Sequence, residues 1–160
     1  MSRSRIPAAV WATVLVGGVC VAQVKLSVPK SWFSAGEKIE ATVTNKGAAP
    51  ITYCMEYGQT SPHGGKLEPT PIPFHVESRD GGVWHVLLNG PDVGSGHQAE
   101  MLDSGASLAF PFRLNNAGEM RLSLYYWVGE RKDVCGESAK RRKKTKSRSF
   151  MIERGSSARD

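Results

Sequence analysis

Seven lysine and arginine residues lie within nine positions near the C-terminal end of the 160-residue chain. They are Lys140, Arg141, Arg142, Lys143, Lys144, Lys146 and Arg148. Cations this close together repel one another, so we expect the run to be a solvated loop that attracts polyanions in a salt-sensitive, sequence-independent way. The alternative is a charged hairpin tip that keeps a sheet edge soluble. No aromatic residue interrupts the run, which disfavours stacking on nucleic-acid bases.

The positive charge of the chain is concentrated in this run. The whole sequence has a formal charge of +6, whereas outside the run and the first 22 residues 12 basic residues face 15 acidic ones. A specific nucleic-acid-binding protein is therefore not predicted. The candidate anionic ligands are acidic polysaccharide, lipopolysaccharide, an anionic membrane surface, or extracellular DNA bound without sequence specificity.

The N-terminal segment has the order of parts of an export signal. Arg3 and Arg5 precede an uncharged stretch from Ile6 to Val24, and small residues at Cys20 and Ala22 favour cleavage after Ala22. The alternatives are an uncleaved membrane anchor and a lipoprotein modified at Cys20. We predict a secreted or periplasmic protein with a signal peptide at 1–22, one domain at 23–153 and a frayed tail at 154–160.

Two cysteines remain after such a cleavage, Cys54 and Cys135. An even number of cysteines in an exported chain favours a disulfide bond, and the alternative is two unrelated small core residues. The bond would close a loop of about 80 residues and stabilise the fold by about 3–5 kcal/mol.

No other residues have the spacing of a reactive site. His63, His75, His85 and His97 are too scattered for a metal motif. No serine lies in a nucleophile elbow, and no glycine-rich segment has the strand-loop-helix context of a phosphate site. We predict no catalytic residues, no cofactor and no metal, and therefore a protein that is not an enzyme.

The elements that would position these residues are short strands. Apolar and polar residues alternate with period two in eight segments, separated by Gly, Pro, Asn and Asp. The segments are 24–28, 39–44, 51–57, 74–79, 83–88, 107–114, 120–128 and 149–153. We expect an all-β fold, an immunoglobulin-like antiparallel β-sandwich of about 7–8 strands, with a closed barrel as the alternative. Pro111 lacks an amide donor and predicts a sheet edge.

The segments between these strands, and the expected strand register, lead to further predictions. The segments 58–73, 89–103 and 129–147 are expected to be loops, and the segment 51–57 to return antiparallel to 39–44. A three-residue hairpin loop at 80–82 would place Arg79 opposite Val83 and His85 opposite Glu77 as a surface pair. It would also place Trp84 on the apolar face, together with Phe74 and Val76. Tyr126 should point away from Tyr125 and Trp127, where with Tyr53 and Tyr57 it would contribute to a protein-binding face.

Several of these turn and strand signals together form a pattern. They are Gly36-Glu37, Phe74-His75-Val76, Asp80-Gly81-Gly82-Val83-Trp84, the segment 102–108, Gly118 and Leu122. In this order the chain resembles small bacterial immunoglobulin-like domains, including the BsuPI proteinase-inhibitor family. The resemblance covers about 24–128 and implies a sandwich and an inhibitory role. The export signal, the two cysteines and the basic run depart from that family.

These observations favour an exported, non-catalytic binding or accessory module with an unknown protein partner. The first alternative is a proteinase inhibitor that presents the segment 58–73. The second is a polyanion-binding protein that uses the basic run.

Overall fold

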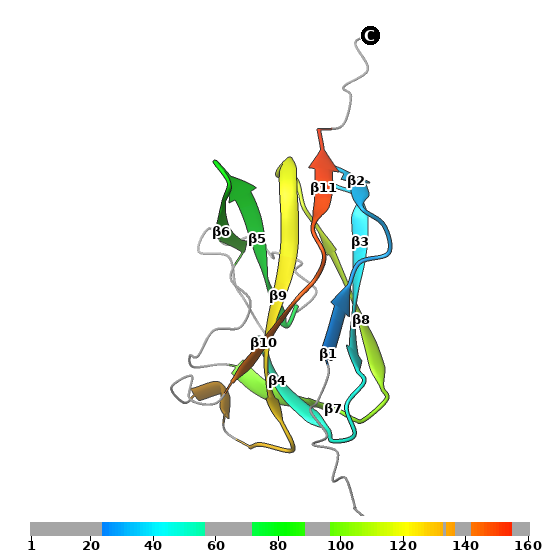
Figure 1. The fold of residues 1–160 in the computed structure, drawn as a ribbon, viewed down its shortest axis with the longest axis vertical. Helices are drawn as coiled ribbons and strands as arrows, with labels where there is room; N and C mark the ends of the chain where they lie inside the picture. Colours follow the sequence, from blue (N-terminus) through cyan, green and yellow to red (C-terminus); the bar gives the residue numbers. More distant parts are fainter. Residues whose placement is uncertain (1–23, 57–71, 89–96, 133, 137–141, 155–160) are drawn as a thin grey trace, which may run out of the picture.

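The computed structural model describes residues 24–56, 72–88, 97–132, 134–136 and 142–154 (Figure 1). These residues form eleven strands and one short 3₁₀ helix, η1 (Val134–Gly136). The strands are β1 (Val24–Ser27), β2 (Trp32–Ser34), β3 (Lys38–Asn45), β4 (Ile51–Glu56), β5 (Phe74–Asp80), β6 (Val83–Leu88), β7 (His97–Leu102), β8 (Ser107–Arg113), β9 (Gly118–Val128), β10 (Lys143–Lys146) and β11 (Phe150–Glu153). Among the described residues no helix is long and apolar enough to cross a membrane.

The strands form two sheets (Figure 1), and the main apolar core contains residues from both of them. The small sheet has the order β1-β3-β8, and the large sheet contains the other eight strands. Ile39, Ala41 and Val43 point inward from the small sheet, as their alternation predicts, and Phe74 and Val76 point inward from the large one. The all-β sandwich is confirmed. Pro111 lies in β8, at the edge of the small sheet, as expected.

Strand β9 is the centre of the large sheet because four strands pair with it. Its first half lies between β5 and β11, and its second half between β4 and β10. Met120, Leu122 and Leu124 are almost completely buried in the core. Because side chains alternate along a strand, the odd-numbered residues of β9 lie on the outer face of the sheet.

The prediction that β3 and β4 form an antiparallel pair is wrong, because the two strands lie in different sheets. The chain crosses between the sheets just after Asn45, which is completely buried. The Asn45 side-chain amide donates to the carbonyl oxygens of Ala49, Leu102 and Asp103 at 2.8–3.2 Å. The Gly47 amide donates to Asn45 Oδ1 at 3.0 Å. A buried polar side chain with these partners stabilises the crossing where no strand pairing is possible.

The hairpin between β5 and β6 is one residue tighter than predicted. Asp80 pairs with Val83, and the loop consists of Gly81 and Gly82 alone, with φ of 53° and 83°. Two consecutive positive φ angles are typical of the tight hairpin turns that fit the twist of the strands. Trp84 therefore pairs with Arg79 on the outer face instead of pointing into the core, and the register shifts between Val76 and Glu77.

Two of the predicted loops contain strands. Residues 97–102 of the expected loop 89–103 form β7, which pairs with β4. Residues 143–146 of the expected loop 129–147 form β10, which pairs with β9. Neither segment has the continuous apolar alternation that marks the other strands, so composition alone did not indicate them.

Strands β10 and β11 run along the same edge of β9, with a bulge between them. Thr145 pairs with Leu124, whereas Phe150 pairs with Met120, so one extra residue is inserted between the two ladders. The bulge changes the core-facing positions from odd-numbered residues in β10 to even-numbered residues in β11. Ser147 is buried there: its hydroxyl accepts from the Leu122 amide at 2.9 Å and donates to the Arg148 carbonyl at 2.7 Å.

Three predicted regions lie outside the described residues. They are the signal peptide at 1–22, residues 58–71 of the candidate inhibitory loop and the last six residues of the tail.

Candidate binding face

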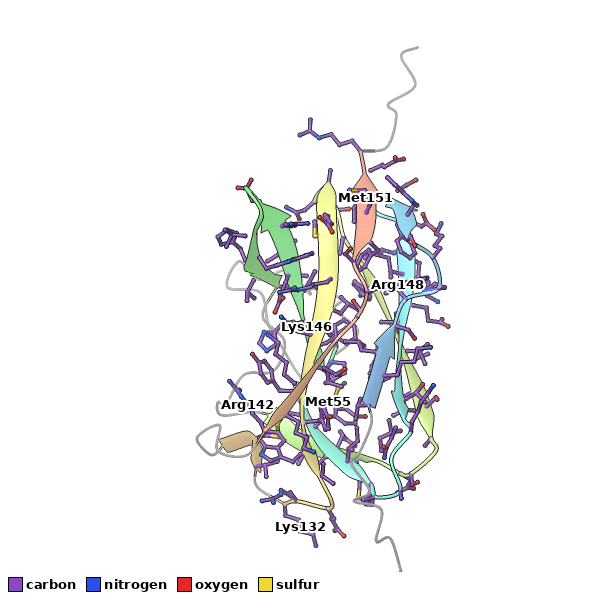
Figure 2. All side chains as sticks on the ribbon, in the orientation of Figure 1. Met55, Lys132, Arg142, Lys146, Arg148 and Met151 are labelled. Atoms are coloured by element: carbon purple, nitrogen blue, oxygen red, sulfur yellow. A yellow bond between two sulfur atoms is a disulfide. The ribbon has the colours of Figure 1, made fainter. Side chains whose placement is uncertain are left out.

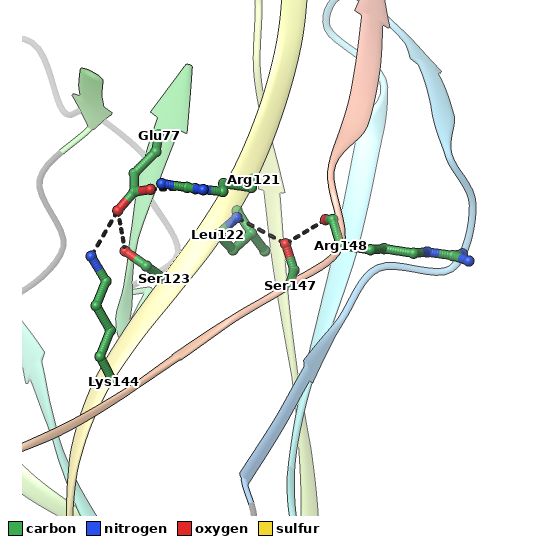
Figure 3. Close-up of polar contacts among 7 residues, drawn as sticks. All are labelled: Glu77, Arg121, Leu122, Ser123, Lys144, Ser147 and Arg148. Carbon is green, nitrogen blue, oxygen red and sulfur yellow. Dashed lines mark hydrogen bonds and ion pairs between the residues drawn. The ribbon is translucent and has the colours of Figure 1, made fainter. Parts of the chain in front are cut away.

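The outer face of the large sheet carries a buried carboxylate, Glu77, that contacts three side chains (Figure 3). Arg121 Nε donates to Glu77 Oε2 at 2.5 Å. Ser123 Oγ and Lys144 Nζ both donate to Glu77 Oε1 at 2.9 Å. These partners come from β9 and β10, so the carboxylate connects three neighbouring strands, β5, β9 and β10.

Aromatic rings and a second ion pair extend this cluster across the face. The Arg121 guanidinium lies 4.0 Å from the centre of the Trp84 ring, and Arg79 lies 5.8 Å from the same ring. Arg79 also forms an ion pair with Glu119 at 3.2 Å. Each cation thus contacts both a ring and a carboxylate.

On the other side of Glu77, the cluster continues to Tyr125. Lys144 Nζ lies 4.9 Å, and the Arg142 guanidinium 4.0 Å, from the centre of the Tyr125 ring. The His75 ring meets Tyr125 edge to face, with 5.4 Å between the ring centres. We call the connected set the charged ladder, in the order Glu119, Arg79, Trp84, Arg121, Glu77, Lys144, Tyr125, Arg142.

Hydrogen bonds within the ladder shift the pKa values of Glu77 and Lys144. Burial raises the pKa of Glu77, but hydrogen bonds from Lys144, Arg121 and Ser123 outweigh it and lower that pKa to about 2. Burial lowers the pKa of Lys144, and hydrogen bonds to Glu77 and Tyr125 reverse this effect, so the pKa of Lys144 is raised. Both groups are therefore charged at neutral pH, and the carboxylate is shared by two cations.

The basic run is not the single solvated loop that its sequence predicts. Of its described cations, two contact other side chains on the outer face, and the other three are exposed. Lys144 binds Glu77 and Arg142 lies over Tyr125, so these two belong to the charged ladder. The Lys143, Lys146 and Arg148 side chains are exposed. Figure 2 shows Arg142, Lys146 and Arg148 spread along β10 and the bulge, and in Figure 3 Arg148 points away from Glu77. Lys140 and Arg141 lie outside the described residues.

A disulfide bond lies at the end of the outer face where β4 pairs with β9. Cys54 and Cys135 are joined, with their Cα atoms 5.7 Å apart. Together with Trp127 and Val134 they form a small apolar cluster separate from the main core. The predicted bond is present in the structure, and a disulfide indicates a non-reducing compartment.

Two predicted surface features are wrong. The pairing of His85 with Glu77 does not occur, because the tighter hairpin places His85 opposite Ser78 and leaves Glu77 to Arg121 and Lys144. The tyrosine face does not form either. Tyr53 and Tyr126 are buried in the main core, and Tyr57 lies outside the described residues.

Among the described residues no three His, Cys, Asp or Glu side chains form a possible metal site.

The charged ladder has little local signature in the sequence. Arg79, Arg121 and Glu119 are single charges in otherwise ordinary strands, and Trp84 was expected in the core. A register prediction with a two-residue turn would have placed Arg79 beside Trp84. The outward positions of β9 alternate as Glu119, Arg121, Ser123 and Tyr125, and this polar stripe is the signal that marks the face.

Comparisons with known proteins give a distant structural likeness only. No protein-family model matches the chain, and no curated protein matches it. It is similar to the crystal structure of Spo0M, a sporulation control protein from Bacillus subtilis, with a TM-score of 0.41 and 16% identity over 82% of this chain. It is also similar to the Pseudomonas fluorescens alkylpurine DNA glycosylase AlkC bound to DNA containing an abasic site analog, with a TM-score of 0.35 and 14% identity over 83% of this chain.

The chain spans 49% of the Spo0M chain and 31% of the AlkC chain. The resemblance to the BsuPI proteinase-inhibitor family stays a prediction.

Proposed function

We propose that this chain is an exported, non-catalytic binding module and that it binds its partner on the outer face of the large sheet. The observation that carries the proposal is the charged ladder, which connects β6, β5, β9 and β10 through ion pairs and ring contacts. Side chains that already contact one another lose little conformational freedom on binding. Such a face offers charged and aromatic groups in fixed positions.

Export is part of the same proposal. The basic, then uncharged N-terminal sequence is typical of a signal peptide, and the Cys54–Cys135 disulfide agrees with a non-reducing destination. A partner is therefore sought in the periplasmic or extracellular fraction.

The experiment is a capture of partners from that fraction with matched variants on the two faces. Val86 is 53% exposed on β6 beside Glu77, and Ala109 is exposed on the small sheet. V86E and A109E introduce the same side chain on opposite sides of the sandwich. We expect the wild type and A109E to enrich the same partner, and V86E to lose it. Equal capture by V86E, or no partner enriched over the unfolded protein, contradicts the proposal.

A panel of proteases separates this proposal from the inhibitor alternative. A binding module of this kind leaves the proteases fully active at micromolar concentrations. Inhibition of one protease at such concentrations, unchanged by V86E, would replace the proposal with an inhibitor that uses another surface.

A further inference from the structure

Three cations of the basic run, Lys143, Lys146 and Arg148, form no ion pair with any carboxylate that the structure describes. Lys144, in contrast, forms an ion pair with Glu77 at 2.9 Å. The surface along β10 and its bulge therefore has a positive charge that no described carboxylate compensates.

The backbone that carries these three cations is fixed on both sides. β10 pairs with β9 over four residues, and Lys144 anchors it to β5 through Glu77. Thr145 Oγ1 donates to the Val24 carbonyl of β1 at 3.0 Å, and Ser147 Oγ bonds at the bulge to the Leu122 amide and the Arg148 carbonyl. A rigid backbone orders the cations before a ligand arrives, which lowers the entropic cost of binding.

The arrangement suits an extended ligand better than a compact one. Lys143 and Arg148 are five residues apart, which is about 17 Å in an extended strand. Lys143 and Lys146 leave opposite sides of β10, and the bulge directs Arg148 away from Glu77 (Figure 3). One small anion cannot reach all three cations, whereas a chain with repeated negative charges can lie along the strand.

Two observations favour a polysaccharide over the other polyanions. The Tyr125 and Trp84 rings each have a guanidinium group 4.0 Å from their centre, so nucleic-acid bases cannot stack on those sides. The exposed large apolar residues that a bilayer interface would need lie, in the described part of the chain, on β2, β6, β7 and β8 and not on β10 or the bulge. Among the described residues they are Trp32, Val83, Val86, Leu88, Met101 and Leu108.

We infer that the partner is an anionic polysaccharide that lies along β10 and the bulge and contacts Lys143, Lys146 and Arg148. The inference rests on the proposed function and names the chemistry of the partner. It extends the contact from the outer face, where Lys146 lies, to the other side of β10, where Lys143 lies. The contact is electrostatic, so its affinity falls as the salt concentration rises.

The test measures binding of the purified full chain to heparin, a sulfated polysaccharide, over a series of salt concentrations. The variant K143S/K146S/R148S removes the three cations and keeps Lys144, whose loss would disturb Glu77. The control K38S/K46S/R131S removes two lysines and one arginine that are exposed elsewhere. The unfolding midpoint of each variant is measured to establish that it is folded. Single-stranded DNA and vesicles of phosphatidylglycerol and phosphatidylcholine serve as competing probes.

We expect the first variant to bind heparin roughly 10- to 100-fold more weakly at low salt, with a shallower salt dependence, and the control to remain close to wild type. Equal losses in both variants would show that net charge alone acts and would overturn the inference. Tight binding to vesicles or DNA with weak binding to heparin would also overturn it. The partner capture with V86E and A109E does not depend on heparin, so the proposed function can survive the failure of this inference.

Discussion

The two faces of β9 are stabilised by different physical effects. On the inner face Met120, Leu122 and Leu124 are at most 1% exposed and pack in the main core. On the outer face Arg121 and Ser123 bond to one carboxylate. Burial of apolar surface does not depend on pH, whereas the outer face depends on the charge of Glu77. The same strand should therefore respond in two distinct ways to mutation and to acid.

The largest loss is expected on the inner face. Leu122→Ala leaves a cavity at a completely buried position, and we expect the free energy of unfolding to fall by about 3–5 kcal/mol. Urea denaturation at neutral pH measures it. The matched control is Leu108→Ala, because Leu108 is 43% exposed; it should change stability by less than about 1 kcal/mol. Similar losses in the two variants would contradict the assignment of the inner face to the core.

The inner face is also the part of the fold that the sequence predicts best. In β1, β3 and β9 the apolar residues alternate, and the structure buries those residues as expected. Strand β10 reads Lys-Lys-Thr-Lys and contains no apolar residue. Its place in the sheet is supported by Glu77, which is distant in the sequence, and by the Val24 carbonyl. Contacts of that kind have no local pattern, so composition indicated a loop.

The charged ladder was not predicted because the predicted β5–β6 hairpin loop is one residue longer than the observed loop. Asp80-Gly81-Gly82 is compatible with a two- or a three-residue loop, because glycine adopts positive φ with little strain. The choice between them reverses the face on which Trp84 lies. The disulfide could be predicted without knowing the register, since the cysteine count and the predicted export signal were sufficient.

The next largest effect is expected at the disulfide that covers the far end of the outer face. The bond joins residues 81 positions apart, so removing it restores considerable freedom to the unfolded chain. C54A/C135A should lower the free energy of unfolding by about 3–4 kcal/mol, in the lower part of the range that loop closure predicts. Reduction of the wild type with dithiothreitol should reproduce this loss, and dithiothreitol should leave the variant unchanged. A variant as stable as the oxidised wild type would show that the bond is not structural.

A smaller loss is expected for the central carboxylate of the ladder. Glu77→Gln keeps the shape but leaves Arg121 and Lys144 without a counter-charge, and we expect a loss of about 2–3 kcal/mol. The two cations are partly exposed, at 18% and 32%, which keeps the cost below that of a fully buried pair. Glu119→Gln is the matched control, because its ion pair with Arg79 is more exposed, and its loss should be clearly smaller. Equal losses would mean that Glu77 has no special position.

Acid should destabilise the outer face by protonating Glu77. The pKa of Glu77 is about 2 in the folded protein, below the ordinary 4.5, so its charged form stabilises the fold above about pH 4.5. This contribution is lost as the pH falls from about 4.5 to about 2. The difference in stability between the wild type and Glu77→Gln should be constant above pH 5 and narrow below it. Urea midpoints from pH 7 to pH 2.5 measure this, and parallel curves would show that Glu77 is not the responsive group.

The smallest effect is expected where the ladder reaches β6. Trp84→Ala removes a partly buried ring that Arg121 and Arg79 contact, and we expect a loss of about 1 kcal/mol. Trp32→Ala, at 57% exposure, is the control and should cost less. Because Arg121 contacts both Trp84 and Glu77, the double variant with Glu77→Gln should differ measurably from the sum of the single losses. Strict additivity would mean that the ladder consists of independent pairs. Coupling would mean that the side chains of the four strands form one network. A ligand bound at β10 would then also change the contacts of Trp84 on β6.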